Sequence, residues 1–299
     1  MTKMKISPKF LLSGALIGLV LLLAAFFSFP DGKLHLVFCD VGQGDAIYIK
    51  AATGEDILID GGPNEKVLSC LGSHMPFYDR TIDLVILSHP QADHLNGLIS
   101  VLERYNVEYF VSSGAVNETE GFKKLQDLLK DKKISQKNFW AGGKIEMDNL
   151  EIRGLWPEDI HSGRVMASTS FQPATPGVVS TEDINENSLV LKLSYGSFDA
   201  LLTGDAGAET LEGIGGDGGT EGIEVLKVPH HGSKTSLLES FLEAIKPQLA
   251  IISVGKNSYG HPAEEILRAL RDLGVKTLRT DKDGEIEIVS DGKGWQVKD

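Results

Sequence analysis

The stretch Ser88-His89-Pro90-Gln91-Ala92-Asp93-His94 follows directly on the largely apolar run Ile82-Asp83-Leu84-Val85-Ile86-Leu87. A run of this length that is rich in β-branched residues and ends at proline and polar residues predicts a buried strand. Two histidines and an aspartate follow that strand, and imidazole and carboxylate groups are common ligands of divalent metals. The alternative is structural: His89 ends the strand, Asp93 caps the next helix and His94 lies at the surface.

Two further apolar strands are predicted to end in residues of the same kind. One is Leu201-Leu202-Thr203-Gly204-Asp205, and the other is Leu226-Lys227-Val228, which leads into Pro229-His230-His231-Gly232-Ser233. In open α/β sheets, ligands collect at the carboxyl ends of the strands. Three strands that each deliver histidine or aspartate at this end therefore predict one shared metal site.

In this order, the three motifs resemble the metallo-β-lactamase superfamily of binuclear metallohydrolases. Within that superfamily, Phe38–Asp45, Ile59–Gly62 and Gly260–Pro262 resemble the ComEC-type competence branch, and the resemblance covers residues 34–290. It implies an α/β fold, the αββα sandwich, in which two packed sheets carry helices on their outer faces. The alternation of strands and helices alone does not distinguish this sandwich from a doubly wound sheet.

The resemblance also implies metal ligands, position by position. The central family motif is His-x-His-x-Asp-His, which assigns His89 to a first metal and Asp93 and His94 to a second. Asp205 matches the aspartate that bridges the two metals. His230 is the best match to the histidine that completes the second metal, and His231 either exchanges that role with it or acts from behind the ligands.

Gln91 departs from the family pattern, because the family has a histidine at this position. An amide carbonyl is a harder and weaker donor than imidazole for zinc, so Gln91 predicts a first metal that is loosely bound or replaced by Mn²⁺ or Mg²⁺. The expected cofactor is one or two Zn²⁺ ions. A separate family histidine that precedes the Thr-Gly-Asp strand has no clear match, and Asn187 occupies a plausible place for it.

The implied chemistry is hydrolysis, because a metal held in this way lowers the pKa of bound water to roughly 7. The expected catalytic residues are Asp93, Asp205 and His261. His261 is expected to donate to the developing anion or to protonate the leaving group; alternatively, it is a histidine at a helix start that bonds only to backbone. The residues expected behind the ligands or against the substrate are Asp40, Gln43, Asp45, Asp60, Asn187, His231, Ser233 and Asn257, with Asp60 supporting ligand imidazoles.

Residues 10–29 form an apolar stretch without a charged side chain, and about 20 such residues span a bilayer. Lys3, Lys5 and Lys9 precede it, so the positive-inside rule places the N-terminus in the cytoplasm and the rest outside. A cleavable signal peptide is the alternative. The predicted organisation is a cytoplasmic stub with a single transmembrane helix over residues 1–31, followed by a hydrolase domain over residues 32–299.

The charge of the chain limits its partners. Without residues 1–30 it has 26 basic and 42 acidic side chains, a net charge of −16. This balance disfavours non-specific attraction to phosphate backbones.

The only two cysteines, Cys39 and Cys70, could pair in an oxidising exterior. The apolar strand pattern around Cys39 instead favours a buried free thiol.

Residues 164–186 are rich in Ser, Thr, Pro and Gly without apolar periodicity, which predicts a lid, a binding loop or disorder. His161, just before this segment, is expected to be exposed. Together these observations predict a membrane-anchored, externally facing, metal-dependent hydrolase, and the ComEC-type resemblance implies phosphodiesters as its substrates, with DNA as a candidate. The alternatives are a hydrolase of another ester or a lactam, and a non-catalytic extracellular binding module with a degraded metal site.

Overall fold

The computed structural model describes residues 13–14, 18, 30–158, 184–215 and 219–298. The chain divides into two compact units, Met1–Asp31 and Gly32–Asp299. Nearly all of the predicted membrane-spanning stretch, His161 and most of the predicted loop at 164–186 lie outside the described residues. Within the described ranges, no helix has the length and apolar character needed to cross a bilayer.

Two sheets form the second unit. The first has eight strands in the order β15 (Trp295–Val297), β14 (Ile286–Ser290), β1 (Leu34–Phe38), β2 (Ile47–Lys50), β3 (Asp56–Ile59), β4 (Thr81–Leu87), β5 (Asn106–Ser112) and β6 (Ser135–Asn138). The second has seven strands in the order β13 (Lys276–Arg279), β12 (Leu249–Ile252), β11 (Val225–Lys227), β10 (Phe198–Leu202), β9 (Val190–Tyr195), β8 (Leu150–Trp156) and β7 (Lys144–Met147).

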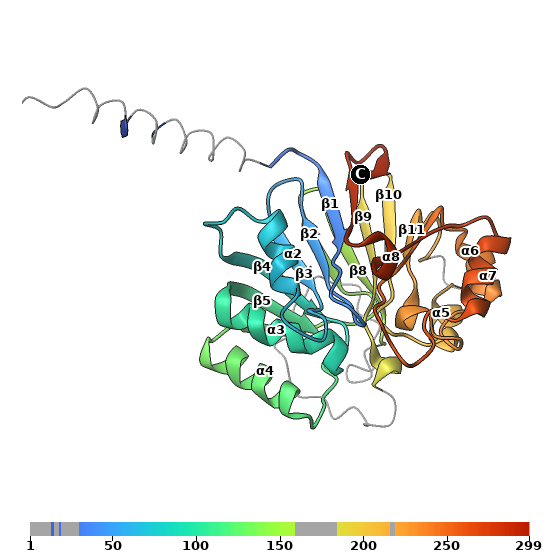
Figure 1. Ribbon diagram of the computed structural model, residues 1–299, viewed down its shortest axis with the longest axis horizontal. Coiled ribbons are helices and arrows are strands. Elements are labelled where there is room, and N and C mark those ends of the chain that lie inside the picture. Colours follow the sequence, from blue (N-terminus) through green and yellow to red (C-terminus); the bar gives the residue numbers. More distant parts are fainter. Residues whose placement is uncertain (1–12, 15–17, 19–29, 159–183, 216–218, 299) are drawn as a thin grey trace, which may run out of the picture. The chain divides into compact units, whose positions relative to one another are not determined.

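Helices cover the outer face of each sheet (Figure 1). The first sheet carries α2 (Val67–His74), α3 (Ala92–Arg104) and α4 (Glu120–Asp131), and the second carries α5 (Ala208–Gly215), α6 (Glu239–Ile245) and α7 (Glu264–Asp272). The short elements are η1 (Asn185–Asn187), η2 (Pro229–Gly232) and α8 (Thr280–Asp283). The arrangement confirms the predicted αββα sandwich and excludes a single doubly wound sheet.

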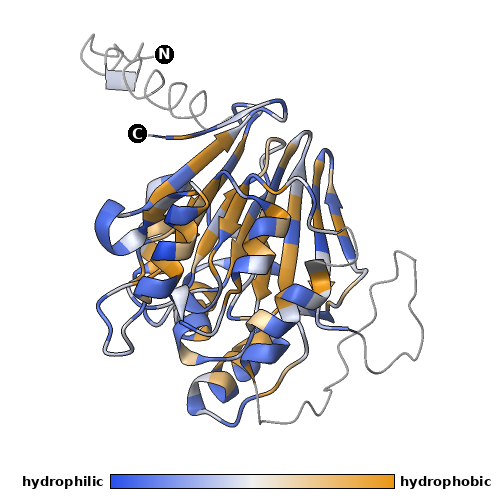
Figure 2. Cartoon of the chain, turned by 90° about the vertical axis from the view of Figure 1, so that its right-hand side faces the viewer, coloured by the Kyte–Doolittle hydropathy of each residue, from blue (hydrophilic) through white to orange (hydrophobic). Residues whose placement is uncertain are grey.

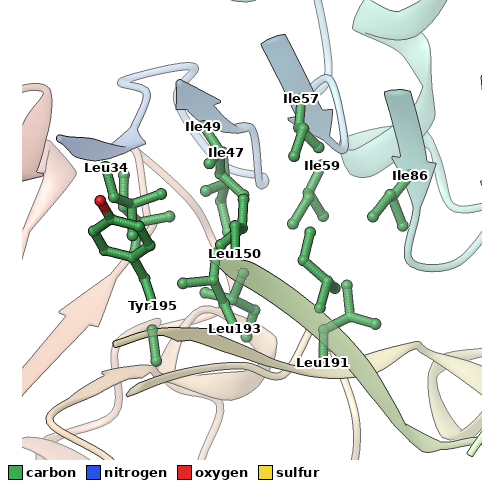
Figure 3. Close-up of a cluster of buried hydrophobic side chains, with 14 of the residues drawn as sticks. Leu34, Ile47, Ile49, Ile57, Ile59, Ile86, Leu150, Leu191, Leu193 and Tyr195 are labelled. Carbon is green, nitrogen blue, oxygen red and sulfur yellow. The ribbon is translucent and has the colours of Figure 1, made fainter. Parts of the chain in front are cut away.

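Side chains alternate along the strands because successive residues point to opposite faces of a sheet. In β4, Leu84 and Ile86 face the other sheet, whereas Val85 and Leu87 face the helices. Both faces of β4 are therefore buried, which explains its nearly continuous apolar sequence. Figure 3 shows the interior between the sheets, and Figure 2 shows that apolar residues concentrate on the strands, while hydrophilic residues mark the helices and loops.

Parallel pairing determines where the strand ends meet. In the first sheet β3, β4, β5 and β6 pair in parallel, and in the second sheet β10, β11, β12 and β13 do so. The segment after β4 carries His89, the segment after β10 carries Asp205, and the segment after β11 carries His231. The parallel parts of the two sheets thus bring all three motifs to one buried junction.

Cys39 and Cys70 form a disulfide, with their Cα atoms 5.8 Å apart. The predicted free thiol at Cys39 was therefore wrong. Cys70 lies on α2, a helix for which no expectation was formed, and the packing of α2 against the first sheet places it beside the end of β1. The proximity of the two sulfur atoms depends on this packing and has no signature in the spacing of the cysteines.

We expect the disulfide to contribute about 3–4 kcal/mol to the free energy of unfolding, because it restricts the unfolded chain across a sequence separation of 31 residues. Urea denaturation should show this loss in a Cys39→Ser, Cys70→Ser double variant. Wild-type protein held reduced is the control for the serine side chains, and it should unfold at a similar urea concentration. Equal midpoints for oxidised and reduced protein would contradict the expectation.

Candidate metal centre

The turn after β4 presents the first group of site residues. The backbone N–H of Gln91 donates to His89 O over 3.0 Å, and α3 begins at the next residue, so Asp93 and His94 lie in its first turn. A glycine-rich loop packs against this turn: a Cβ atom on Gly44, whose φ is +146°, would lie 2.2 Å from Asp93 O. Glycine at this position therefore allows the loop that carries Asp45 to approach the centre.

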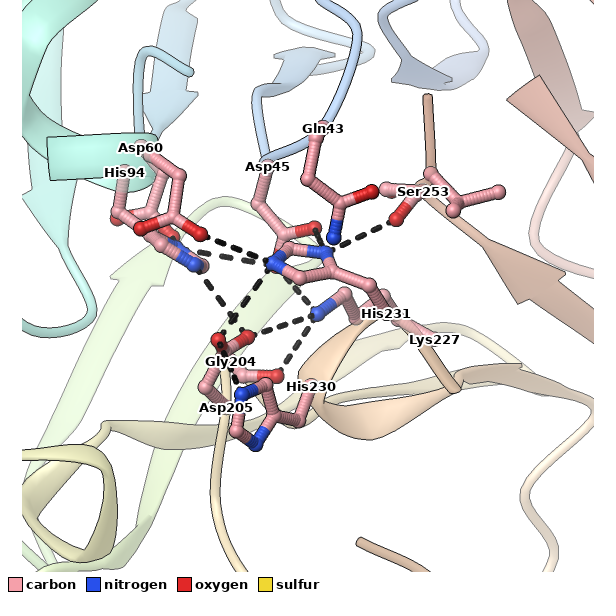
Figure 4. Close-up of polar contacts among 12 residues, drawn as sticks. Gln43, Asp45, Asp60, His94, Gly204, Asp205, Lys227, His230, His231 and Ser253 are labelled. Carbon is pink, nitrogen blue, oxygen red and sulfur yellow. Dashed lines mark hydrogen bonds and ion pairs between the residues drawn. The ribbon is translucent and has the colours of Figure 1, made fainter. Parts of the chain in front are cut away.

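Asp93, His94, Asp205 and His231 each offer one ligand atom, and these four atoms lie within 4.8 Å of one another. His231 Nε2 lies 3.3 Å from Asp93 Oδ2 and 3.5 Å from Asp205 Oδ2. His94 Nε2 lies 3.3 Å from Asp205 Oδ1. Two imidazoles and two carboxylates form a donor set suited to Zn²⁺ or Mn²⁺. Figure 4 shows His94, Asp205 and His231 pointing toward one another.

Unsatisfied polar atoms give an independent test of this assignment. In the described part of the chain, the buried Nε2 atoms of His89, His94 and His231 and both carboxylate oxygens of Asp205 lack hydrogen-bond partners. Buried polar groups are nearly always paired, so a cluster of unpaired donors and acceptors requires an explanation. A cation bound among the atoms of His94, Asp205 and His231 would satisfy them, and these residues therefore fit a divalent metal.

The other nitrogen of each imidazole ring has a partner that fixes the tautomer. His231 Nδ1 lies 2.9 Å from Ser253 O, which can only accept, so Nδ1 carries a hydrogen. His94 Nδ1 lies 2.8 Å from Asp60 Oδ2, which likewise accepts. In the neutral form, both rings therefore direct a bare Nε2 toward the cluster, the form that binds metal.

Asp60 supports this arrangement from behind. Its carboxylate accepts hydrogen bonds from Ser88 N at 2.8 Å and from Ser88 Oγ at 2.7 Å, besides its contact with His94. Because the hydroxyl hydrogen of Ser88 goes to Asp60, Ser88 Oγ accepts from His89 Nδ1 at 3.1 Å. The side chains of Asp60 and Ser88 together thus orient two histidines.

His231, rather than the predicted His230, lies in the four-residue cluster. The side chain of His231 is 1% exposed, whereas that of His230 is 32% exposed and its Nε2 lies 3.8 Å from Asp205 Oδ2. Both residues have positive φ values in η2, +48° for His230 and +53° for His231. This turn decides which ring faces inward, and adjacent histidines in a sequence do not reveal it.

The predicted first metal position has less support. His89 is fully buried, and its ring centroid lies 4.1 Å from that of His94, but His89 is not a member of the four-residue cluster. Gln91 is half-buried at the N-cap of α3. Asn187 ends η1, next to Ser188, whose Oγ accepts from Asp205 N at 3.1 Å. A second ion at His89 and Gln91 stays a prediction.

Lys227 is a site residue that the sequence analysis missed. Its side chain is 0% exposed, and its ammonium contacts Asp45, donates to Gly204 O over 2.7 Å and lies 3.7 Å from Asp205 Oδ1. Asp45 in turn lies 3.5 Å from His231 Nδ1. A lysine at the end of the apolar strand β11 was the available signal, since lysine is almost never fully buried without a partner.

The remaining predicted residues surround the centre. Gln43 Oε1 accepts from Gly255 N at 3.2 Å, and the Asn257 side chain holds the following loop through bonds to His261 backbone atoms. The His261 ring centroid lies 5.6 Å from that of His230.

Asp40 is exposed, and its Oδ1 accepts from Gly42 N at 3.3 Å. Ser233 follows η2 and contacts it through its backbone N–H, which donates to His230 O over 2.9 Å.

Charges in the centre shift the pKa values of its groups in opposite directions. Burial and the neighbouring His94 lower the pKa of His89 to about 3. Burial opposes protonation of His231 too, but the charges of Asp205 and Asp45 raise its pKa to about 9. Burial opposes ionisation of Asp205, yet His231 and His94 hold its pKa well below the usual range. Without metal, protons on His94 and His231 therefore balance the carboxylates.

The family model described as the metallo-beta-lactamase superfamily matches residues 39–256. The chain belongs to the metallo-β-lactamase superfamily. The match spans the β4, β10 and β11 motifs, so the resemblance inferred from those motifs is confirmed.

Two curated proteins are similar to this metallo-β-lactamase chain over most of its length. ComE operon protein 3 of Bacillus subtilis (strain 168) is 29% identical over 276 residues, which are 86% of this chain and 33% of that protein. Competence protein ComA of Neisseria gonorrhoeae is 28% identical over 282 residues, which are 90% of this chain and 35% of that protein. The resemblance to the ComEC-type branch is confirmed, and the chain spans about a third of the length of these relatives.

A solved structure gives the same answer for the fold. The metallo-beta-lactamase fold protein YhfI from Bacillus subtilis aligns with a TM-score of 0.54 at 12% identity, covering 85% of this chain and 99% of that one. Its chain has the same sandwich, and at this identity the likeness concerns the fold alone.

The raised pKa of His231 predicts how the stability of the metal-free protein depends on pH. The pKa of His231 is about 9 in the folded chain, above its ordinary value of 6.5, so protonated His231 stabilises the folded state. This stabilisation is fully present below pH 6.5 and is lost as the pH rises through 9. Urea denaturation in the presence of a chelator should show a free energy of unfolding that falls between pH 6.5 and pH 9. His231→Gln should flatten the dependence, and an unchanged slope in that variant would contradict it.

Lys227→Met should lower the free energy of unfolding by about 3–5 kcal/mol, because it leaves the carboxylate of Asp45 buried without its cation. Adding Asp45→Asn to Lys227→Met removes that uncompensated charge and should recover part of the loss. Urea denaturation of both single variants and the double variant forms the cycle that measures the coupling. Strictly additive losses would rule out the pair as a stabilising interaction.

Proposed function

We propose that the chain is a metal-dependent hydrolase that cleaves phosphodiester bonds of DNA. The observation that carries this proposal is the convergence of Asp93, His94, Asp205 and His231, in which the buried ligand atoms of His94, Asp205 and His231 lack hydrogen-bond partners. The donor set favours Zn²⁺ or Mn²⁺, and a bound ion would supply Lewis acidity and a water of lowered pKa. The substrate class rests on the competence proteins to which the chain is similar.

The chain's own residues orient the ligands and place a hydrogen-bond donor near the centre. Asp60 and the carbonyl of Ser253 hold the rings of His94 and His231, so the ligand set is fixed before a substrate arrives. His261 is half-buried at the rim, where burial and the nearby His230 lower its pKa, so its imidazole is neutral at neutral pH. A neutral imidazole has one N–H that can donate a hydrogen bond to the developing anion, whereas protonating a leaving oxygen would require the imidazolium form.

The acidic net charge of the chain limits which contacts could attract DNA. A net charge of −16 over residues 31–299 disfavours non-specific attraction to phosphate backbones, so the bound metal and contacts near it would supply the attraction. Under this proposal the affinity for DNA is modest and depends on the metal. The same charge is compatible with another ester or a lactam as substrate, and these remain the competing outcomes of the assays below.

The proposal includes a location. Residues 10–29 would anchor the chain in the cell membrane as a single-pass helix, and residues 32–299 would lie outside the cytoplasm. The Cys39–Cys70 disulfide supports an oxidising compartment for this part. Protease treatment of intact cells should degrade the domain, whereas protection until lysis would place it in the cytoplasm. Mass spectrometry of the N-terminus distinguishes an anchor from a cleaved signal peptide.

Asp205→Asn should abolish metal binding and hydrolysis, because this carboxylate contacts both histidines of the cluster. The measurement is metal content by mass spectrometry on residues 32–299, followed by turnover with Zn²⁺ or Mn²⁺. Substrates are single-stranded DNA, bis-p-nitrophenyl phosphate and a chromogenic lactam. Asp272→Asn, on an exposed side chain at the end of α7, is the matched control and should retain both properties.

The results separate the candidate functions. Phosphodiester cleavage that disappears in Asp205→Asn supports the proposal, and lactam turnover without phosphodiester cleavage would overturn it. Absence of bound metal, even after incubation with Zn²⁺ or Mn²⁺, would favour a non-catalytic binding module. The number of ions per chain tests whether His89 and Gln91 support a second metal.

A further inference from the structure

We propose that Tyr259 is a stacking platform for a nucleobase of single-stranded DNA whose phosphate lies at the metal centre. This inference rests on the proposed function and deepens it by naming the form of the substrate. It is carried by a row of aromatic rings that leads from the metal centre to the surface, and by a loop whose backbone holds the outermost ring in place.

The row begins at His231, a member of the metal cluster, which is 1% exposed. The centroid of the His230 ring lies 6.2 Å from that of His231, and the centroid of His261 lies 5.6 Å from that of His230. The Tyr259 ring follows at 5.7 Å from His261, tilted by 32°. Each ring neighbours the next, so the row connects the buried centre with Tyr259, which is 74% exposed.

The backbone around Tyr259 is held by one side chain. Asn257 Oδ1 accepts from the backbone N–H groups of Tyr259, Gly260 and His261 at 3.0–3.1 Å. Asn257 Nδ2 donates to Gly255 O over 2.9 Å and to His261 O over 2.7 Å. These five bonds hold residues 255–261 as one unit, so Tyr259 is exposed on an ordered loop.

The start of this loop is packed against the loop that carries Asp45. A Cβ atom on Gly255 would lie 2.4 Å from Gly42 C and 2.5 Å from Gln43 N, so only glycine permits the contact. Gly255 N also donates to Gln43 Oε1 over 3.2 Å. The position of Tyr259 is therefore coupled to the metal centre through backbone contacts, and its own side chain need not be buried to be held.

Chemistry favours a nucleobase as the group that covers this ring. An exposed tyrosine offers a flat apolar face with a polar edge, and it loses little conformational entropy when a planar group stacks on it. Every base has such a face, but in a duplex the bases stack on one another, so a single strand is the accessible form. Lys256, exposed on the same loop, adds a cation suited to a neighbouring phosphate.

Exposure alone does not make this argument, because single exposed apolar residues are common. Phe77 and Tyr78 are 79% and 54% exposed in the connection between α2 and β4. They precede β4, whereas the metal centre lies beyond its carboxyl end, at the opposite edge of the sheet. Tyr78 therefore provides a matched control for the loss of an exposed tyrosine ring.

The test compares two fluorescent strands of about 12 nucleotides, one of thymidines and one with abasic residues on the same phosphate backbone. Fluorescence anisotropy on metal-loaded protein, with phosphorothioate versions of both strands that resist cleavage, measures binding separately from turnover. Wild-type protein should bind the thymidine strand about tenfold more tightly than the abasic strand. Tyr259→Ala should reduce this ratio to near one, Tyr259→Trp should preserve it, and Tyr78→Ala should match the wild type.

A wild-type ratio near one, or a ratio that Tyr259→Ala leaves unchanged, would overturn the inference. Turnover of both strands with Mn²⁺ or Zn²⁺ keeps the two proposals apart. If the wild type cleaves both strands without a base-dependent affinity, the hydrolase proposal stands and the stacking proposal fails. If affinity depends on the base and on Tyr259 but neither strand is cleaved, the stacking subsite stands and the phosphodiesterase proposal fails.

Discussion

Balance of charge at the buried junction between the two sheets is the constraint on which this structure depends. Asp45, Asp60 and Asp205 are buried there, and Asp93 lies at the edge. Carboxylates at such close range repel strongly in a medium of low dielectric constant, so each requires a cation or several hydrogen-bond donors. Lys227 supplies one permanent cation, and protons or a metal shared by the imidazoles supply the rest.

This balance connects folding with function. The ammonium of Lys227 neutralises Asp45 by a direct contact between side chains. The Nε2 atoms of His94 and His231, in contrast, have no hydrogen-bond partner and are available to a metal ion. An ion bound at His94 and His231 would take the place of the imidazole protons, so metal binding would be linked to pH. The rim has a different character, because Tyr259, His261 and His230 place aromatic surface at the entrance of an acidic domain.

Several site residues were predictable because their chemistry is local. Asp93 and His94 of the cluster follow a strongly apolar strand, and Asp205 ends another, so the signal lies in a strand pattern and the residues that terminate it. Residues whose role depends on a partner distant in sequence were not predictable. Lys227 neutralises a carboxylate 182 positions earlier in the chain, and Cys39 meets its partner only through the packing of α2.

The sequence by itself determined the alternation of strands and helices and the positions of the candidate metal-binding motifs, because both are properties of neighbouring residues. The superfamily and its αββα class followed from the resemblance that the ordered motifs carry, since periodicity alone does not distinguish the sandwich from a doubly wound sheet. Tertiary structure decided which of His230 and His231 joins the cluster of ligand atoms, since the left-handed turn of η2 sets their directions. It also decided the disulfide, the buried Lys227–Asp45 pair and the position of Tyr259. These features depend on distances between separate elements, which only the packed sheets establish.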